Sequence, residues 1–276
     1  MIGYRDLLIC MRCHAFPEFC LDTLDAIRSM TCPTTTRIVC AVDGRNKSLA
    51  KILATALGGQ GEVYSADRKF GWGAGLWSLL AKSILEFESR FRFGHFVTVD
   101  YDTLFIKPGA DEMLLSTVTD AKIGLIGHYS AVNEHWAAIF HRERDALSCR
   151  LGGIPKGYIP GEGTQGGCFM ITRAGIDGLR DRGLLRGDWL DVAGFTSIAD
   201  DHLAPLLVRA AGLDVVGLPS VYFNLQWRCD RDPVTLNQTR VKVFHPTKIR
   251  PEIKDRGVEL RVRNFYRGLR GREPLK

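Results

Sequence analysis

The first hundred residues alternate between short apolar segments rich in β-branched residues and longer segments with a helical spacing of apolar residues. Asp6 to Arg12 is an apolar run, Glu18 to Met30 carries apolar residues about one helical turn apart, and Arg37 to Val42 is again strand-like. This order predicts a β-α-β unit, which builds parallel sheets with crossover helices. The alternation continues to residue 99, so we expect an α/β fold.

Later segments extend the same pattern. The further predicted helices are Lys47–Leu57, Leu76–Phe87, Ala174–Arg182 and Asp201–Ala211, and the further predicted strands are Glu62–Ser65, His95–Val99, Cys168–Thr172, Asp214–Leu218 and Val241–Phe244. Between residues 152 and 167 lies a glycine- and proline-rich stretch, GGIPKGYIPGEGTQGG. A loop of this length in a compact domain is typical of a lid or a binding loop.

Size and composition favour one large folded domain. The chain has 276 residues, of which 45% are hydrophobic and 25% are charged, and this balance excludes extensive disorder. No internal repeat, low-complexity tract or linker divides the sequence. One continuous core is therefore expected.

Most of the net charge lies at the C-terminal end. Residues 250 to 276 contain nine Lys or Arg and four Asp or Glu, so this segment carries +5 of the total +6. A basic tail that also holds Phe265, Tyr266 and Leu269 suits peripheral contact with an anionic membrane or with a phosphorylated acceptor. A solvated terminal extension explains the composition equally well. We expect no nucleic-acid partner.

The N-terminal segment and the cysteines point to a reducing compartment. The apolar run from Leu7 to Met11 is too short for a signal-peptide core or a membrane span, so a cytoplasmic location is expected, with peripheral contact at the membrane inner face as an option. Eight cysteines in a chain of this size are expected to be free thiols. Cys10 and Cys13 form a single CxxC without a second pair at zinc spacing, which favours a core role.

The most informative segment is HFVTVDYDTLFIKP, in which a hydrophobic strand leads directly into Asp100, Tyr101 and Asp102. Alternation along an extended chain puts both carboxylates on one side, and ligands of open parallel sheets sit beyond the carboxyl ends of the strands. Two carboxylates there suit a hard cation, Mn²⁺ or Mg²⁺, which in turn prefers phosphate oxygens. A metal-bound diphosphate is therefore predicted at this point.

With these residues the chain resembles the GT-A glycosyltransferases, and the resemblance extends through most of residues 6 to 246. It implies a mostly parallel sheet flanked by helices in three layers, α/β/α. A single domain would span 1–249, with a nucleotide-binding half of about 1–107 and an acceptor-binding half of about 108–249, followed by the extension 250–276. The resemblance also implies that Asp100, with Tyr101 beside it, meets the sugar or ribose of the donor, and that Asp102 binds the metal.

Other landmarks of the family have counterparts in the same order. An acidic residue that contacts the nucleotide base corresponds to Asp43 in IVCAVDG, and a glycine-bearing donor loop corresponds to KFGWGAG, with Lys69, Gly71 and Gly73. Arg12 in MRCHAF stands where the family has its first nucleotide contacts, although the usual threonine or serine, aromatic, asparagine pattern is replaced. These residues are implied to bind the nucleotide-sugar.

The acceptor side is implied by the second half. TQGGCFMITR is similar to the family's acceptor segment and supplies Gln165, Gly166 and Gly167, and ADDHLAPLL supplies the acidic pair Asp200 and Asp201. In inverting members a carboxylate at this place deprotonates the acceptor hydroxyl, and Asp201 is preferred over Asp200. The pair is DD where ED is more usual, so both the base and the stereochemical outcome stay open.

Two further assignments complete the predicted site. His245 in VKVFHPTK matches a third metal ligand that some family members carry late in the fold. Trp136 and Trp189 are candidates to stack on sugar faces at the acceptor side.

Each assignment has a purely structural alternative. Asp43 precedes Gly44 and suits a turn, the acidic pair suits the first turn of a helix, and a lone histidine such as His245 is more often structural. The glycines at 71, 73 and 75 do not complete a dinucleotide-binding fingerprint, which disfavours a Rossmann dehydrogenase. Their common order along one chain favours the functional interpretation.

The function predicted from the sequence is metal-dependent transfer of a sugar from a UDP- or GDP-sugar to an acceptor hydroxyl. One alternative is a sugar-phosphate nucleotidyltransferase, although MRCHAFPEF lacks the glycine-rich, basic loop that grips a triphosphate. The other is a non-catalytic nucleotide- or carbohydrate-binding protein with the same fold.

Overall fold

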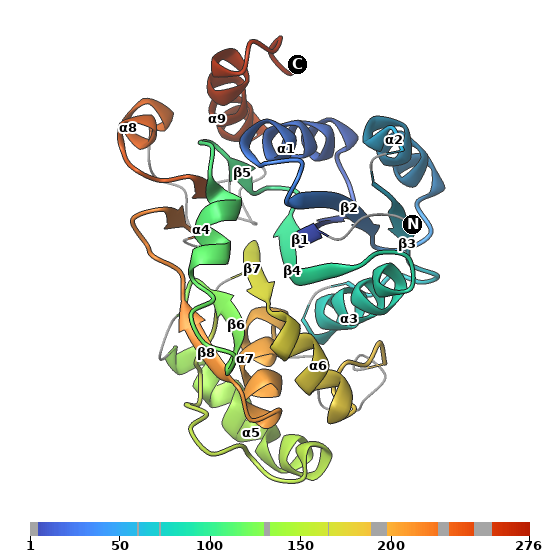
Figure 1. The fold of residues 1–276 in the computed structure, drawn as a ribbon, viewed down its shortest axis with the longest axis vertical. Helices are drawn as coiled ribbons and strands as arrows, with labels where there is room; N and C mark the ends of the chain where they lie inside the picture. Colours follow the sequence, from blue (N-terminus) through green and yellow to red (C-terminus); the bar gives the residue numbers. More distant parts are fainter. Residues whose placement is uncertain are drawn as a thin grey trace.

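The structure is a computed structural model that describes residues 5–59, 61–71, 73–129, 133–164, 166–188, 198–225, 232–245 and 256–276. Its centre is a sheet of seven strands in the order β3-β2-β1-β4-β7-β6-β8 (Figure 1). Strands β1 to β4 are mutually parallel, whereas β7 runs antiparallel to both β4 and β6. The predicted α/β fold with a mostly parallel central sheet is confirmed.

The N-terminal half follows the predicted alternation closely. Its elements are β1 (Arg5–Cys13), α1 (Pro17–Met30), β2 (Thr36–Val42), α2 (Lys47–Leu57), β3 (Val63–Ser65), α3 (Ala74–Glu88), β4 (Phe93–Asp100), β5 (Leu104–Phe105) and α4 (Ala110–Ser116). Each predicted strand and helix of this half is present, with ends that shift by at most two residues.

The elements of the C-terminal half are β6 (Ile123–Gly127), α5 (Glu134–Leu151), β7 (Cys168–Ile171), α6 (Arg173–Asp181), α7 (Asp200–Ala210), β8 (Asp214–Gly217), β9 (Phe223–Asn224), α8 (Pro233–Gln238), β10 (Val243–Phe244) and α9 (Arg256–Leu269). Strands β7 and β8 and helices α6 and α7 were predicted, whereas β6, α5, β9, α8 and α9 were not. Helix α5 was not predicted because its buried side is sparse, with Ile139, Phe140, Glu143 and Leu147 as its buried residues. The predicted strand Val241–Phe244 is present as the shorter β10, in a second sheet of order β5-β10-β9.

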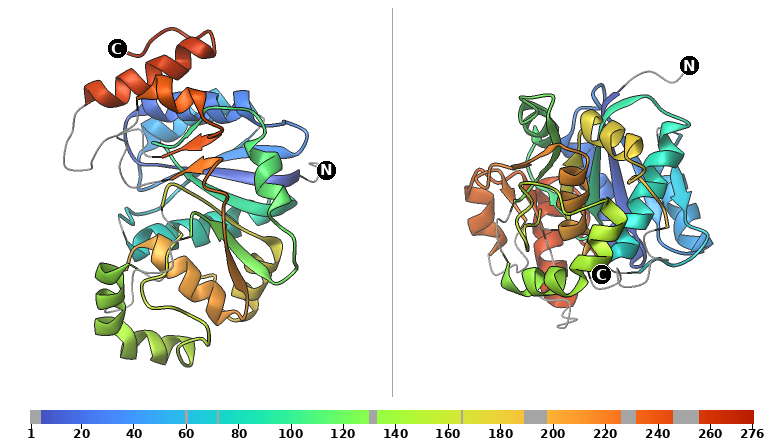
Figure 2. Two further views of the ribbon diagram at one scale, coloured as in Figure 1. Left: turned by 90° about the vertical axis from the view of Figure 1, so that its left-hand side faces the viewer. Right: turned by 90° about the horizontal axis from the view of Figure 1, so that it is seen from below.

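Apolar side chains on both faces of the large sheet produce two cores. Along β1, Leu8 and Cys10 pack on one face, whereas Leu7, Ile9 and Met11 pack on the other. Helices α1, α2 and α4 cover the second face, and α3, α6 and α7 cover the first (Figures 1 and 2). Because strands in such a sheet are buried on both sides, they appear in the sequence as continuous apolar runs.

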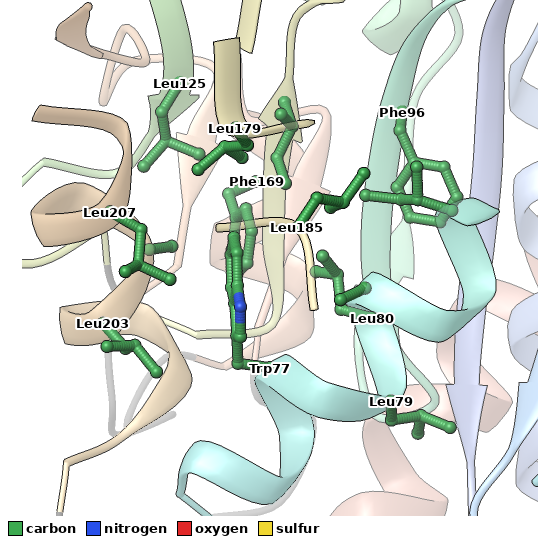
Figure 3. Packing of buried hydrophobic residues seen from close by; sticks show 14 of the residues in the cluster. Trp77, Leu79, Leu80, Phe96, Leu125, Phe169, Leu179, Leu185, Leu203 and Leu207 are labelled. Carbon is green, nitrogen blue, oxygen red and sulfur yellow. The ribbon is translucent and has the colours of Figure 1, made fainter. Parts of the chain in front are cut away.

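Trp77 of α3 lies in the centre of the first core. Its side chain is fully buried and stands between Leu203 and Leu207 of α7 and Leu80 of α3, close to Phe169 of β7 (Figure 3). The indole therefore connects α3, α7 and the sheet. Since α7 carries the acidic pair, this packing sets the position of part of the predicted site.

Helix α9 packs against α1, and the two views of the fold show the same neighbouring placement (Figures 1 and 2). Val262, Arg263 and Tyr266 are buried in this contact. The predicted boundary at residues 249 and 250 lies outside the described residues, but α9 is part of the packed structure and is not a solvated tail.

Two further sequence expectations concern the cysteines and membrane-spanning segments. The cysteines at 10, 13, 20, 32, 40, 149 and 168 are free thiols, as predicted, and Cys229 lies outside the described residues. Among the helices that the structure describes, none is both long enough and apolar enough to cross a bilayer.

We predict that Trp77→Ala lowers the free energy of unfolding by about 3–5 kcal/mol, because it empties a fully buried aromatic site. Trp77→Phe is expected to cost less than Trp77→Ala, because the smaller aromatic ring leaves a smaller cavity. In the described part of the chain the buried Nε1 of Trp77 donates no hydrogen bond, so phenylalanine loses no polar contact. Urea unfolding of the three proteins measures both differences, and equal losses in the two variants would contradict the packing argument.

Candidate active site

The site lies at the edge of the large sheet where β1 and β4 end and β7 begins. Arg12 of β1 and Asp100 of β4 are direct neighbours in the parallel register. The antiparallel β7 begins at the same edge, and the N–H of Asp100 donates to the carbonyl oxygen of Gly167 at 2.8 Å. Strand order therefore brings a cation, an anion and a glycine loop from three distant parts of the sequence to one point.

A tight turn after β4 presents the two acidic residues. The N–H of Thr103 donates to the carbonyl of Asp100 at 3.0 Å, and the Thr103 hydroxyl donates to the carbonyl of Gly167 at 2.8 Å. Asp102 is buried, whereas the side chain of Asp100 is partly exposed. The turn thus holds one carboxylate inside and leaves the other toward solvent.

His245 reaches Asp102 through strand pairing. Strand β5 follows the acidic turn and pairs antiparallel with β10, so that Phe244 lies opposite Leu104. In an antiparallel pair the residue after one strand lies beside the residue before the other. His245 Nε2 lies 3.4 Å from Asp102 Oδ1 as a result.

Asp100, Asp102 and His245 offer three ligand atoms that all lie within 4.8 Å of one another. Two carboxylates and one imidazole form a donor set that suits Mn²⁺ or Mg²⁺, with positions left over for phosphate oxygens or water. The structure therefore brings together the three residues that the sequence predicted as a metal group, and their chemistry fits the predicted ion.

Gly167 is required for the histidine to fit. Its φ is +98°, and a Cβ on this residue would lie 2.3 Å from Cγ of His245. The imidazole ring thus packs directly on the glycine backbone. The sequence placed Gly167 in an acceptor segment, and the structure places it against His245 and the acidic turn.

Arg12 joins the two acidic groups of the site. Its Nε donates to Asp100 Oδ1 at 2.8 Å, and its Nη1 pairs with Asp200 Oδ2 of α7. Arg12 is 4% exposed. Asp100 and Asp200 hold the pKa of the guanidinium above its usual value against the opposing effect of burial, so Arg12 stays charged. The sequence predicted Arg12 as a nucleotide contact, and in the structure it bridges β4 and α7.

The acidic pair at the start of α7 is not a helix cap. The N-cap residue is Ala199, and no side chain caps the helix. Asp200 turns to Arg12, whereas Asp201 Oδ2 accepts the N–H of Gly166 at 2.9 Å. Both side chains are thus directed toward the strand ends and the glycine loop.

Burial changes the acidity of both residues. It raises the pKa of Asp200 to about 6, although Arg12 acts in the opposite direction. Burial also raises the pKa of Asp201, and the hydrogen bond from Gly166 opposes this shift. A carboxylate with a raised pKa is a better proton acceptor than an exposed one, as a general base requires.

Asp43 organises the predicted donor loop. Its two carboxylate oxygens accept the N–H of Phe70 at 2.6 Å and the N–H of Gly71 at 3.0 Å. Gly71 and Gly73 both have a φ of +72°, which favours glycine, and Lys69 is exposed at the start of this loop. The structure therefore links two of the predicted nucleotide contacts into one unit.

The remaining predicted residues fall in different places. Tyr101 is buried, and its ring meets the exposed His14 edge-on at 5.0 Å. Trp136 of α5 stacks on His202 with ring centroids 4.6 Å apart, and His202 directly follows the acidic pair. Gln165 and Trp189 lie outside the described residues.

Sequence reasoning missed two side chains of this region. His202 is buried beneath Trp136, and burial lowers its pKa to about 4, so the ring is neutral near pH 7. Thr103 ties the acidic turn to Gly167 through its hydroxyl. Their positions after the two acidic motifs were the available signal, but neither residue type by itself indicates a contact across the sheet.

No protein-family model matches the sequence, and no curated protein is similar to it in sequence. Among solved structures, a mannosyltransferase from Pyrobaculum calidifontis in complex with GDP-Man and Mn²⁺ matches with a TM-score of 0.50 and 12% identity, over 79% of this chain and 56% of that chain. The galactosyltransferase LgtC, in complex with donor and acceptor sugar analogues, matches with a TM-score of 0.50 and 14% identity, over 96% of this chain and 95% of that one.

This chain has the GT-A fold. The bifunctional glycosyltransferase WbbM, in its apo form, also matches, with a TM-score of 0.51 and 11% identity, over 89% of this chain and 46% of that chain. The chain thus spans about half the length of the mannosyltransferase and of WbbM. The GT-A fold predicted from the acidic motif and the order of landmarks is confirmed.

We predict that Arg12→Met lowers the free energy of unfolding by about 3–5 kcal/mol near pH 7, because Asp100 and Asp200 would lose the buried cation between them. Urea unfolding measures this loss. Arg186, which pairs with Asp188 on the surface, provides the control, and Arg186→Met is expected to change stability by less than about 1 kcal/mol. A loss in Arg12→Met no larger than in this control would show that the bridge is not a structural requirement.

Proposed function

We propose that the protein is a metal-dependent glycosyltransferase that moves a sugar from a nucleoside-diphosphate-sugar to an acceptor hydroxyl. The observation that carries the proposal is the group of Asp100, Asp102 and His245, whose ligand atoms lie within 4.8 Å of one another. This group stands beside an acidic pair at the end of the same sheet. Proteins with the same fold catalyse several different reactions, so the proposal rests on the residues of the site.

Asp100, Asp102 and His245 would hold Mn²⁺ or Mg²⁺. When bound, such a cation neutralises the charge that develops on a diphosphate leaving group. The mannosyltransferase with this fold was solved with GDP-Man and Mn²⁺, which supports a nucleotide-sugar donor with a UDP or GDP moiety. Asp43 holds the loop of Lys69, Gly71 and Gly73, and this unit is the proposed contact for the nucleotide.

Asp201 is the proposed general base. Its Oδ2 is occupied by the N–H of Gly166, whereas its buried Oδ1 makes no hydrogen bond within the described part of the chain. One oxygen is therefore available to take the proton of an acceptor hydroxyl. Asp200 is engaged by Arg12, which favours a role in holding the base and the acidic turn together. The acceptor would enter beside Gly166 and Gly167, with Trp136 as a further contact.

Peripheral membrane contact through the basic C-terminal segment is a separate proposal. Arg263, Arg267, Arg270 and Arg272 form ion pairs with acidic residues of the same chain, which reduces the charge available to a membrane. Arg261 is exposed on α9 and is the best single test of this surface. A cytoplasmic site of action is part of the same proposal.

If this surface binds membranes, the chain co-sediments with vesicles of anionic lipids at low ionic strength and not with vesicles of neutral lipids. Arg261→Glu is then expected to weaken the binding at least about fivefold, because each basic residue near the surface contributes about 1 kcal/mol. A chain that stays in the supernatant with anionic vesicles would refute the membrane contact.

For the transferase, we predict that a UDP- or GDP-sugar raises the melting temperature in the presence of Mn²⁺ and not with a chelator. Asp102→Asn should abolish this shift and reduce the release of nucleoside diphosphate more than about 100-fold, since metal stabilisation of a leaving group is worth several kcal/mol. Asp188→Asn on the surface is the matched control and should retain both properties.

The products separate the alternatives. Nucleoside diphosphate indicates the transferase, pyrophosphate formed from a nucleoside triphosphate and a sugar phosphate indicates a nucleotidyltransferase, and a thermal shift without turnover indicates a binding protein. A metal-dependent turnover that survives in Asp102→Asn would refute the metal site.

A further inference from the structure

Helix α9 carries a buried arginine to the back of the acidic turn. Arg263 is 0% exposed, and its neighbours Val262 and Tyr266 are also buried, so this side of α9 faces the protein. Arginine is rarely buried to this extent unless its donors are paired. The partners of Arg263 therefore show what holds it in place.

The guanidinium of Arg263 is shared between two acidic residues and the acidic turn. Nη1 donates to Asp22 Oδ2 at 2.9 Å, and Nε donates to Glu259 Oε1 at 3.0 Å. Nη2 donates to the carbonyl oxygen of Tyr101 at 2.8 Å. The hydroxyl of Thr23 on α1 donates to the same carbonyl at 2.5 Å. A carbonyl oxygen has two lone pairs, so both acceptor positions of Tyr101 are occupied.

This carbonyl lies within the predicted metal motif. Tyr101 stands between Asp100 and Asp102, and its C=O belongs to the planar peptide unit that includes the N and Cα atoms of Asp102. Two donors on that oxygen fix the orientation of this peptide plane, and they thereby fix the position of the Asp102 Cα atom, from which the side chain extends. From the other side, the carbonyl of Gly167 receives the N–H of Asp100 and the hydroxyl of Thr103. The turn is held on both sides.

Stability alone does not explain a buried arginine here. Ion pairs inside a protein cost so much desolvation that apolar residues of similar size often stabilise the fold as well. What an apolar residue does not supply is a directed donor to the Tyr101 carbonyl. The geometry of that donor, and not the charge, is the distinctive property of Arg263.

We infer that Arg263 is a positioning residue for the metal site, and that α9 is required for cation binding although it lies more than 150 positions from the acidic motif in the sequence. The inference rests on the proposed function, because it concerns the same Asp100 and Asp102. Through Tyr101, Arg263 and Thr23 hold the two carboxylates at the separation that the cation needs.

The same helix offers a matched control. Arg270 is nearly as buried as Arg263 and also pairs with Asp22, at 2.6 Å, and with Asp25, at 3.2 Å. The Arg270 side chain donates to these acids of α1, whereas Arg263 in addition reaches the Tyr101 carbonyl. Arg270→Lys therefore weakens the docking of α9 without removing a donor from the acidic turn.

The experiment is titration of the full-length protein with Mn²⁺ alone, followed by calorimetry, with melting temperatures measured in parallel. Arg263→Lys keeps the positive charge and loses the planar set of donors, and Thr23→Val removes the other donor to Tyr101 with little change in volume. Both variants are expected to bind Mn²⁺ about tenfold more weakly, since groups that orient metal ligands typically contribute 10- to 100-fold to affinity. Arg270→Lys is expected to lower the melting temperature and to leave the Mn²⁺ affinity unchanged.

Unchanged Mn²⁺ affinity in Arg263→Lys and Thr23→Val would overturn the inference while the metal site stood. Equal weakening in Arg270→Lys would also overturn it, because the loss would then follow from looser docking of α9. Where Arg263→Lys does not fold, Thr23→Val decides. If the unmodified protein fails to bind Mn²⁺ even at millimolar concentration, the metal site itself is refuted and the inference with it.

Discussion

The buried guanidinium of Arg12, held between Asp100 and Asp200, connects the two parts of the site. Burial favours the protonated form of a carboxylate, and repulsion from nearby carboxylates adds to this effect, as the raised pKa of Asp200 shows. A cation between them lowers this cost and fixes their separation. Because Arg12 belongs to β1, which pairs with the middle strand β4, the distance between the acidic turn and α7 is set by the sheet itself.

Around this bridge, backbone pairing does most of the positioning. The second sheet returns the chain from β10 to β5, and this pairing delivers His245 to Asp102. Strand β7 delivers Gly167, whose carbonyl holds the acidic turn and whose missing side chain leaves space for the imidazole. Side-chain chemistry is thus concentrated at a few positions, and the sheet registers determine where those positions meet.

Support for the site also comes from remote segments. Trp77 fixes α3 against α7 in one core, and α9 reaches the acidic turn through Arg263. The arginine-rich segment, which in sequence resembles a solvated or membrane-directed tail, has four of its arginines in ion pairs with acidic residues, and all four pair with Asp22 or Asp25 of α1. Charge composition did not distinguish these situations, because the partners of those arginines lie about 240 residues earlier.

The sequence by itself determined the α/β alternation, the acidic turn after a buried strand and the order of the landmarks, because these are local patterns of apolar spacing and residue type. It also indicated Asp100, Asp102 and His245 as a group through the family resemblance. Only the tertiary structure decided that Arg12 bridges Asp100 and Asp200, that Asp43 holds the glycine loop, and that Arg263 reaches Tyr101. These contacts join residues far apart in the chain, and their existence depends on strand order and helix packing, which no local pattern of residues specifies.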